Sequence, residues 1–434
     1  MGVGKGKYNR QKWKSFLDEA GKRTENEKDY KNYEDSFLAF MREYEEKKKD
    51  DLEASLKYYK DATTTDFFNS HYISLNEKHI KFALARCKVM IITANPIEKA
   101  VLHHKIVDYG SIIMTRILCE TTAYYIFKWG KYWVAHIHQS QTGAWKDMGT
   151  NFTIGDALKL FTPNVIISLG IAFGIDYNTQ NIGDVLVSRR LFPYSENKRD
   201  EDYVKPDRTQ DKTIDDWLHV RLENAIGFLD GVTYGDILSG GSVMSSFKEK
   251  DRICLGYTKA DYIIGGEMEG NAVFQYAKKV DIPGVVIKGI CDWGVAKNGI
   301  FPNDPEREDL FKDSLQAFAM KKAVKKCKAL FNDKEIFSTP KNITLKKLRE
   351  KYFFCKWGLI VSQLIMVTNG IYILWCRWNY RIGKSIDVRD EFFDNPMVWL
   401  ALPLIFMMTF LLKILIDAIP KLLWRLRACL KRYL

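Results

Sequence analysis

Residues 164–174 read NVIISLGIAFG, a β-branched apolar run that ends among small residues. Such a run is typical of a strand that is buried on both faces of a sheet. Similar runs lie on either side of it, separated by helix-length segments: CKVMIITA (87–94), YWVAHIHQS (132–140), GDVLVSRR (183–190), YGDILSGGSV (234–243), DYIIGGEME (261–269) and GVVIKGICD (284–292). This alternation predicts an α/β domain over residues 78–331, with a mixed, largely parallel sheet flanked by helices.

Acidic residues stand at the ends of three predicted strands. Glu98 follows the first strand, Glu267 and Glu269 end DYIIGGEME, and Asp292 ends GVVIKGICD. Folds of this class bind ligands at the carboxyl ends of their strands. The carboxyl groups are therefore expected to meet in one crevice, provided that the strands are neighbours.

Each acid also has a structural explanation. Asn95-Pro96-Ile97-Glu98 fits an N-cap, a proline at the first helical position and the acid of a capping box. Asp292 would suit a turn, and Glu269 would suit a helix N-terminus because of the helix dipole. From the local sequence alone, capping is favoured over catalysis for Glu98.

The order of the motifs resembles a known superfamily. NVIISLGIAFG, GDVLVSRR, GGEMEGNAVF (265–274) and DIPGVVIKGICD (281–292) follow one another as in purine nucleoside phosphorylases and methylthioadenosine/S-adenosylhomocysteine nucleosidases. The similarity covers roughly residues 88–330. It implies a nucleoside phosphorylase-like fold, cleavage of a purine N-glycosidic bond, and a homo-oligomer.

The resemblance also implies roles for individual residues. Asp292 corresponds to the acid at the purine N7, and Glu98 to the glutamate that activates water, so these two are the expected catalytic residues. Substrate-binding residues are expected at Glu269 (ribose hydroxyls), Met268 (sugar face), Val243 and Met244 (base), Gly170, Ala172 and Gly174 (a turn against the ribose) and Asn95, with Glu267 and Cys291 in support.

Hydrolysis is the favoured reaction. Phosphorylases of this family place an arginine before the Gly-x-Ala-like turn, where this chain has Ser168. The polar side chains of Thr93 and Asn95 disfavour an alkylthio substrate and favour a purine nucleoside or nucleotide. A purine nucleoside phosphorylase and a non-catalytic nucleoside-binding membrane receptor are the alternatives. The loop with Arg189, Arg190, Lys198 and Arg199 would reach a 5'-phosphate, although a solvated surface role is favoured for it.

The distribution of charge and the cysteine pattern indicate which partners and cofactors the protein is expected to bind. The formal charge of +12 lies largely beside apolar segments near the C-terminus, which favours a lipid bilayer over nucleic acid as the partner. The eight cysteines are scattered, without a CxxC pair, so the sequence predicts neither a metal site nor a cofactor, and it indicates a reducing compartment.

The two ends of the chain differ from the middle. Residues 1–77 are charged and aromatic, and apolar side chains at helical spacing predict one or two amphipathic helices between about residues 27 and 60: Tyr30, Tyr33, Phe37, Phe40, Tyr44, Leu52, Leu56 and Tyr59. Such helices either pack their own apolar stripe as a small domain or bind a partner.

The C-terminal region predicts a membrane hairpin. A basic linker (332–356) precedes residues 357–417, in which segments 357–375 and 397–416 are each long and apolar enough to span a bilayer, and a basic tail follows (418–434). A buried core helix is the alternative for the first segment. The basic flanks predict that both termini and the α/β domain face the cytosol.

Overall fold

The computed structural model describes residues 4–118, 122–139, 150–194, 198–199, 204–206, 211–226, 229–241, 244–258, 261–296 and 298–340. Almost all of them belong to one compact unit, Met1–Ser338. Among the described helices, none is long and apolar enough to cross a membrane. The predicted hairpin (357–417) and basic tail (418–434) lie outside the described residues, as does most of the linker.

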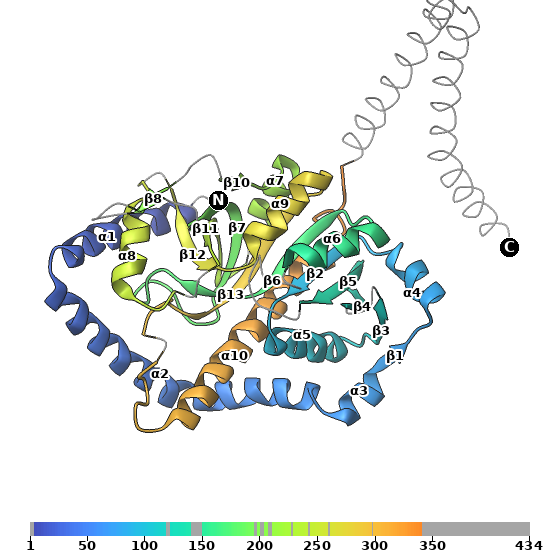
Figure 1. Ribbon diagram of the computed structural model, residues 1–434, viewed down its shortest axis with the longest axis horizontal. Coiled ribbons are helices and arrows are strands. Elements are labelled where there is room, and N and C mark those ends of the chain that lie inside the picture. The colour runs from blue at the N-terminus through green and yellow to red at the C-terminus, as the bar shows by residue number, and fades with distance from the viewer. Residues whose placement is uncertain are drawn as a thin grey trace, which may run out of the picture. The chain divides into compact units, whose positions relative to one another are not determined.

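The described unit is built on one mixed sheet (Figure 1). Its strands are β1 (Tyr72–Ser74), β2 (Val89–Thr93), β3 (Ile113–Leu118), β4 (Thr122–Trp129), β5 (Tyr132–His138), β6 (Val165–Gly174), β7 (Val185–Pro193), β10 (Lys212–Thr213), β11 (Val232–Ser239), β12 (Ile263–Glu267) and β13 (Gly284–Asp292). The short strands β8 (Lys198–Arg199) and β9 (Val204–Lys205) pair separately. All seven runs that the sequence predicted as strands are strands here.

The strand order is β1-β3-β4-β5-β2-β6-β12-β11-β7-β10, and β13 pairs with both β6 and β7. The strands β6, β12, β11, β7 and β13 therefore close into a ring. This closure positions the site, because β13 runs parallel to β6 and places Lys288 opposite Gly170.

The predicted mixed α/β sheet is confirmed, but it is less parallel than expected. The strands β3, β4 and β5 form an antiparallel meander, and β12 runs antiparallel to β6. A tight turn at Gly130, where φ is +54°, joins β4 to β5. Short turns of this kind can connect only antiparallel strands.

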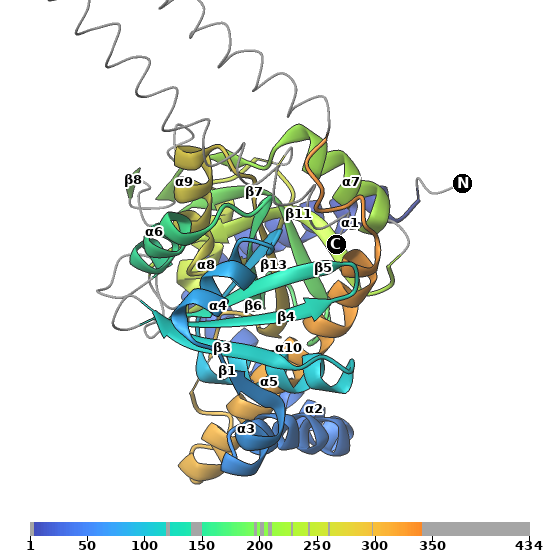
Figure 2. The same cartoon turned by 90° about the vertical axis from the view of Figure 1, so that its right-hand side faces the viewer.

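Helices cover both faces of the sheet (Figures 1 and 2). They are α1 (Gly4–Thr24), α2 (Glu27–Ala62), α3 (Thr65–His71), α4 (Glu77–Leu84), α5 (Pro96–Asp108), α6 (Thr150–Leu160), α7 (Asp216–Ile226), α8 (Phe247–Leu255), α9 (Gly270–Val280) and α10 (Pro305–Asn332). On one side α10 packs against α2, α5 and β13, and on the other α6 and α9 pack together over β6 and β13.

The N-terminal stripe packs against the α/β domain rather than against itself. Helix α2 extends further than predicted, and its Phe37 and Met41 are buried in a cluster with Trp293, Phe311 and neighbours from α10. An amphipathic pattern shows which face of a helix is buried, but it does not show what buries it.

Candidate active site

Glu98 sits in the first turn of α5, at the carboxyl end of β2, with 1% of its surface exposed. The predicted capping box is present: the backbone amide of Glu98 donates to Asn95 Oδ1 (2.8 Å), and Glu98 Oε2 accepts from the amides of Asn95 (3.2 Å) and Ala94 (2.6 Å). Its other oxygen, Oε1, accepts from the amide of Ile171 on β6 (2.8 Å). The carboxyl group of Glu98 is therefore held in place both by the capping box and by its hydrogen bond to β6.

Gly170 makes this arrangement possible. A Cβ atom at Gly170 would lie 2.0 Å from Glu98 Oε1, a distance that no side chain tolerates. The segment from Gly170 through Ala172 to Gly174 is the end of strand β6, so the expected turn is a strand here, and the contact of these residues with the ribose stays a prediction. The strand continues because Gly174 and Phe173 pair with Gly265 and Gly266 of β12. Small residues are needed here for close approach rather than for a turn.

The two acids of DYIIGGEME have different tasks. Glu267 ends β12, and its Oε2 accepts from the amides of Glu269 (2.9 Å) and Gly270 (2.7 Å), so it caps α9. Glu269 is the N-cap residue by position, but its side chain makes no capping bond. Instead, Glu269 Oε2 accepts from Lys288 Nζ at 2.9 Å. Glu267 therefore supports the start of α9, whereas the carboxyl group of Glu269 pairs with Lys288.

Lys288 connects the acids. Its ammonium group lies 2.9 Å from Glu269 Oε2 and 3.9 Å from Glu98 Oε1, with 1% of the residue exposed. Burial by itself lowers the pKa of Lys288, but the charges of Glu269, Glu98 and Glu267 outweigh it and raise that pKa above its ordinary value. Lys288 therefore remains charged. We call Glu98, Glu267, Glu269 and Lys288 the carboxylate cluster.

The carboxylate cluster holds more acid than base. Burial raises the pKa of Glu98 and of Glu267, and the positive charge of Lys288 opposes this in both cases. Three carboxyl groups surround one ammonium group, so ionisation of more than one of them gives this site of low dielectric constant an excess of negative charge. Such a site favours a ligand group that carries or develops positive charge.

Asp292 lies further along β13 than Lys288, opposite Phe173 of β6. Four residues separate the two, which is roughly 13 Å in an extended strand. Asp292 is half-buried, and its Oδ1 accepts from the amide of Gly294 at 2.6 Å, in a turn where Gly294 has φ +66°. Cys291 Sγ donates to Asp292 Oδ2 (3.2 Å). The structure thus brings Glu98 and Glu269 together through Lys288, and Asp292 lies further along the same strand as Lys288.

A small cavity of about 100 Å³ opens beside Asp292 and Cys291. Gln316 of α10 lines it and accepts from Asn95 Nδ2 at 3.2 Å, which links the lining of the cavity to the start of α5. The cavity thus lies between the predicted acid and the start of α5, where the resemblance expects the substrate.

The other predicted residues surround these groups. Met268 is half-buried between Glu267 and Glu269, and Ala172 is buried. Met244 is buried and packs near Phe173 and Gly294. Val243 lies outside the described residues.

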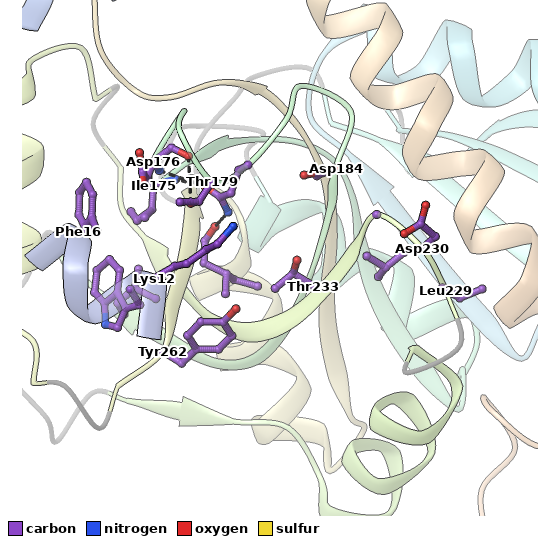
Figure 3. Close-up of a pocket in the computed structure, with 16 residues that line it drawn as sticks. Lys12, Phe16, Ile175, Asp176, Thr179, Asp184, Leu229, Asp230, Thr233 and Tyr262 are labelled. Carbon is purple, nitrogen blue, oxygen red and sulfur yellow. Dashed lines mark hydrogen bonds between the residues drawn. The ribbon is translucent and has the colours of Figure 1, made fainter. Parts of the chain in front are cut away.

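A larger cavity of about 390 Å³ lies elsewhere, between α1 and the starts of β11 and β12 (Figure 3). Lys12 and Asp176 stand near one end of it, and Asp184 and Asp230 near the other. None of the predicted site residues lines it. Size is therefore a poor guide here, and the chemistry of the strand ends identifies the site better.

Two features of this region were not predicted as functional. The first is Lys288, although a lysine inside the apolar strand VVIKGI is itself a signal of a buried charge partner. The second is a chain of side chains that joins Tyr72, His103, His136, Thr93 and His138, which we call the histidine network.

The histidine network is continuous. Its links are Tyr72 Oη to His103 Nδ1 (2.6 Å), His103 Nε2 to His136 Nδ1 (2.8 Å), His136 Nε2 to Thr93 Oγ1 (3.0 Å) and Thr93 Oγ1 to His138 Nδ1 (3.1 Å). Burial lowers the pKa of His103 and His136 well below the ordinary value and that of His138 to about 4. These imidazoles are therefore neutral near pH 7.

Two of the basic residues that were considered for a 5'-phosphate already have an anionic partner. Arg189 and Arg190 both donate to the buried carboxylate of Asp236, at distances from 2.5 to 3.1 Å. Their positive charge is used to hold β7 and β11 together.

The comparisons with known proteins agree with this architecture. A family model described as the phosphorylase superfamily matches residues 90–330, more than half of the chain. The chain belongs to the phosphorylase superfamily. The match begins inside β2 and ends inside α10, so it includes every residue of the carboxylate cluster and leaves α1 and α2 outside.

Three individual proteins illustrate the level of similarity. A death domain-containing ATP nucleosidase of Amphimedon queenslandica is 23% identical over 193 residues, which are 39% of this chain and 36% of that protein. The chain thus matches little more than a third of that relative's length. Among solved structures, the S-adenosylhomocysteine nucleosidase of Streptococcus pyogenes is 19% identical (TM-score 0.44; 57% of this chain and 96% of that one). The futalosine hydrolase of Helicobacter pylori is 15% identical (TM-score 0.44; 56% and 97%).

Proposed function

We propose that the protein is an N-glycosidase that hydrolyses a purine nucleoside or nucleotide to the free base. The observation that carries this proposal is the carboxylate cluster, in which Lys288 holds Glu269 and lies near Glu98 at the carboxyl ends of β2 and β6. The name of the Amphimedon relative, an ATP nucleosidase, supports the same reaction class and brings ATP among the candidate substrates.

The electrostatics of the cluster suit this reaction. When an N-glycosidic bond breaks, positive charge builds on the ribose and negative charge on the departing purine. Preorganised opposite charge stabilises such a transition state most strongly where water is excluded. The excess carboxylate around Glu269 would face the ribose, and a proton from Asp292 would neutralise the base.

The water oxygen bonds to the anomeric carbon as the bond from that carbon to the purine N9 breaks. Glu98 takes the proton that the water loses, and Asp292 delivers a proton to the purine N7. Burial raises the pKa of Glu98 towards the range in which a carboxylate is an effective base. Each proton transfer contributes on the order of 10²- to 10⁴-fold.

Hydrolysis is proposed over phosphorolysis because of the cation in the cluster. Lys288 is already occupied by Glu269 and sits beside further carboxylates, which would repel phosphate. Ser168, where phosphorylases of the family have arginine, is buried at 1% exposure on β6. A purine nucleoside phosphorylase is the second candidate function, and a non-catalytic nucleoside-binding membrane receptor is the third.

We further propose that residues 357–417 anchor this domain in a membrane, with the domain and both termini in the cytosol. The two long apolar segments, of which the first has no charge and the second contains only Lys413, support this together with their basic flanks. Depletion of a purine pool at a membrane is the effector role that we propose for the enzyme. Self-association, by resemblance to the superfamily, is part of the proposal.

The test uses the full chain in detergent. Adenosine, inosine, AMP and ATP are incubated with it, with and without phosphate, and the products are chromatographed. We expect free base with ribose or ribose phosphate in both conditions. Ribose 1-phosphate formed only in the presence of phosphate would show a phosphorylase, and binding without any released base would show a receptor.

The Asp292→Asn variant tests the assignment of the acid. We expect it to lower kcat by at least about 10²-fold, because it removes the proton donor. Asp309→Asn is the matched control, since Asp309 lies on α10 with its side chain 81% exposed. Equal turnover in the two variants would contradict the role of Asp292.

A further inference from the structure

Helix α2 reaches the cavity beside Asp292, although it lies outside the segment that matches the superfamily. Phe37 and Met41, one turn apart on α2, line that cavity together with Cys291 and Asp292. Both are almost fully buried, with 1% and 2% of their surfaces exposed. The N-terminal region thus contributes two apolar side chains to the wall of the space where the base is proposed to bind.

The same helix holds the residue that follows Asp292. The rings of Phe37 and Phe40 meet Trp293 edge-to-face, with centroids 5.9 and 5.7 Å away. Trp293 has no exposed surface. Edge-to-face contacts fix the mutual orientation of aromatic rings as well as burying them. The position of the Asp292 backbone therefore depends on α2 through its neighbour Trp293.

Lys250 completes the attachment from the other side. Its ammonium group is fully buried and donates to the backbone carbonyls of Trp293 and Ile175, both at 3.0 Å. The residue that follows it, Asp251, accepts two bonds from Arg23 at the end of α1 (3.0 and 3.3 Å). Helices α1 and α8 and the Trp293 turn are thus joined by buried polar contacts, which are costly to leave unpaired.

Outside this core, α2 is held by groups on the far side of the cavity. Arg42 Nε donates to the carbonyl of Ile300 (2.8 Å), and Arg307 pairs with Glu45 (2.6 Å). Ile300 itself lines the cavity. The helix is therefore attached on both sides of the space that it covers.

We propose that α2 is part of the active site. Phe37 and Met41 form the apolar wall against which a planar purine base packs, and Phe37 is a positioning residue that keeps Asp292 in place through Trp293. This inference rests on the proposed hydrolysis. Specificity for the base is then set partly by a helix that the superfamily match does not include.

The test compares two variants of the full-length protein. Phe37→Ala removes the contact with Trp293, and Leu56→Ala is the matched control, because Leu56 is also buried on α2 but does not line this cavity. We expect Phe37→Ala to lower kcat for base release at least about tenfold, and Phe37→Leu to restore part of it, whereas Leu56→Ala changes kcat less than about twofold.

A second readout does not depend on turnover. Cys291 lines the cavity and is buried, so its alkylation by iodoacetamide, followed by peptide mass spectrometry, reports whether the wall is closed. Cys327, buried on α10 away from the cavity, reports global unfolding. We expect Phe37→Ala to raise the labelling rate of Cys291 relative to Cys327 at least about fivefold, and Leu56→Ala to leave the ratio unchanged.

The outcomes separate the two proposals. If Phe37→Ala and Leu56→Ala behave alike in both readouts while the wild type releases base, the role of α2 is wrong and the proposed function survives. If the wild type releases no base, the proposed function fails, and the labelling ratio still decides whether α2 closes the cavity.

Discussion

The carboxylate cluster and the histidine network come close together in the sequence at the end of β2, but their buried groups differ in charge. Thr93, in the network, ends β2, and Glu98, in the cluster, lies five residues later. The cluster keeps a charged Lys288 among carboxyl groups, whereas burial leaves His103 and His136 neutral. The difference lies in the partners of the buried groups. Opposite charges nearby stabilise the ionised form of a buried group, whereas neutral imidazoles and hydroxyls do not.

The comparison indicates where chemistry is expected. A buried charge with a surplus of carboxylate can respond to a ligand that develops positive charge, and a closed neutral network has no such surplus. Its hydrogen bonds instead hold β2 and β5 to α5, through Thr93, His136 and His103. Three changes would break or sharpen this contrast.

Lys288→Met should have the largest effect. Removal of one partner from a buried ion pair costs about 3–5 kcal/mol of folding stability. Burial already raises the pKa of Glu98, and loss of the positive charge raises it further, so the acidic limb of the pH–rate profile should move to higher pH. Urea unfolding and pH–rate profiles measure the two effects. Lys278→Met on the exposed end of α9 is the control, and equal effects of both would show that Lys288 is not a buried charge partner.

His103→Gln should reveal the neutral state of the network. His103 is neutral when folded, but the unfolded chain gains a proton as the pH falls through 6.5, so the wild type loses up to about 1.4 kcal/mol of stability per pH unit below that value because of this residue. The variant should be less stable than the wild type at pH 8, and the gap should narrow between pH 6.5 and 5. Urea unfolding at each pH measures it, with the exposed His79→Gln as control. A gap that stays constant would mean that His103 takes up a proton in the folded protein over the same pH range as in the unfolded chain, which would contradict its neutrality in the network.

Gly170→Ala should have the smallest effect on stability of the three, about 1–3 kcal/mol, because a methyl group would overlap the carboxyl group of Glu98. Base release should fall more than stability, since the displaced group is the proposed base. Gly21→Ala on α1, where nothing lies within 4 Å, should instead stabilise the protein by about 0.5–1 kcal/mol. Thermal unfolding and turnover at the same temperature measure both, and an unchanged turnover in Gly170→Ala would argue against Glu98 as the base.

The strands were predictable because their sequences carry the pattern of burial locally. The apolar runs of β2, β6 and β13 have few polar interruptions, and the capping box of α5 is written in four consecutive residues. The meander of β3 and β4 was missed because its strands mix aromatic, polar and basic residues, for example TAYYIFKW in β4. Such a strand has no clear period to recognise.

The sequence by itself determined the α/β class, the candidate acids and the apolar stripe of α2, since each depends on residues that are close along the chain. Only the tertiary structure decided how these are combined. Closure of β13 onto β6 brings Lys288 to Glu98 and Glu269, and packing of α2 on Trp293 joins the N-terminal region to the site. These contacts join residues far apart in sequence, and their partners are chosen by the register of strands and the fit of side chains, which no local pattern specifies.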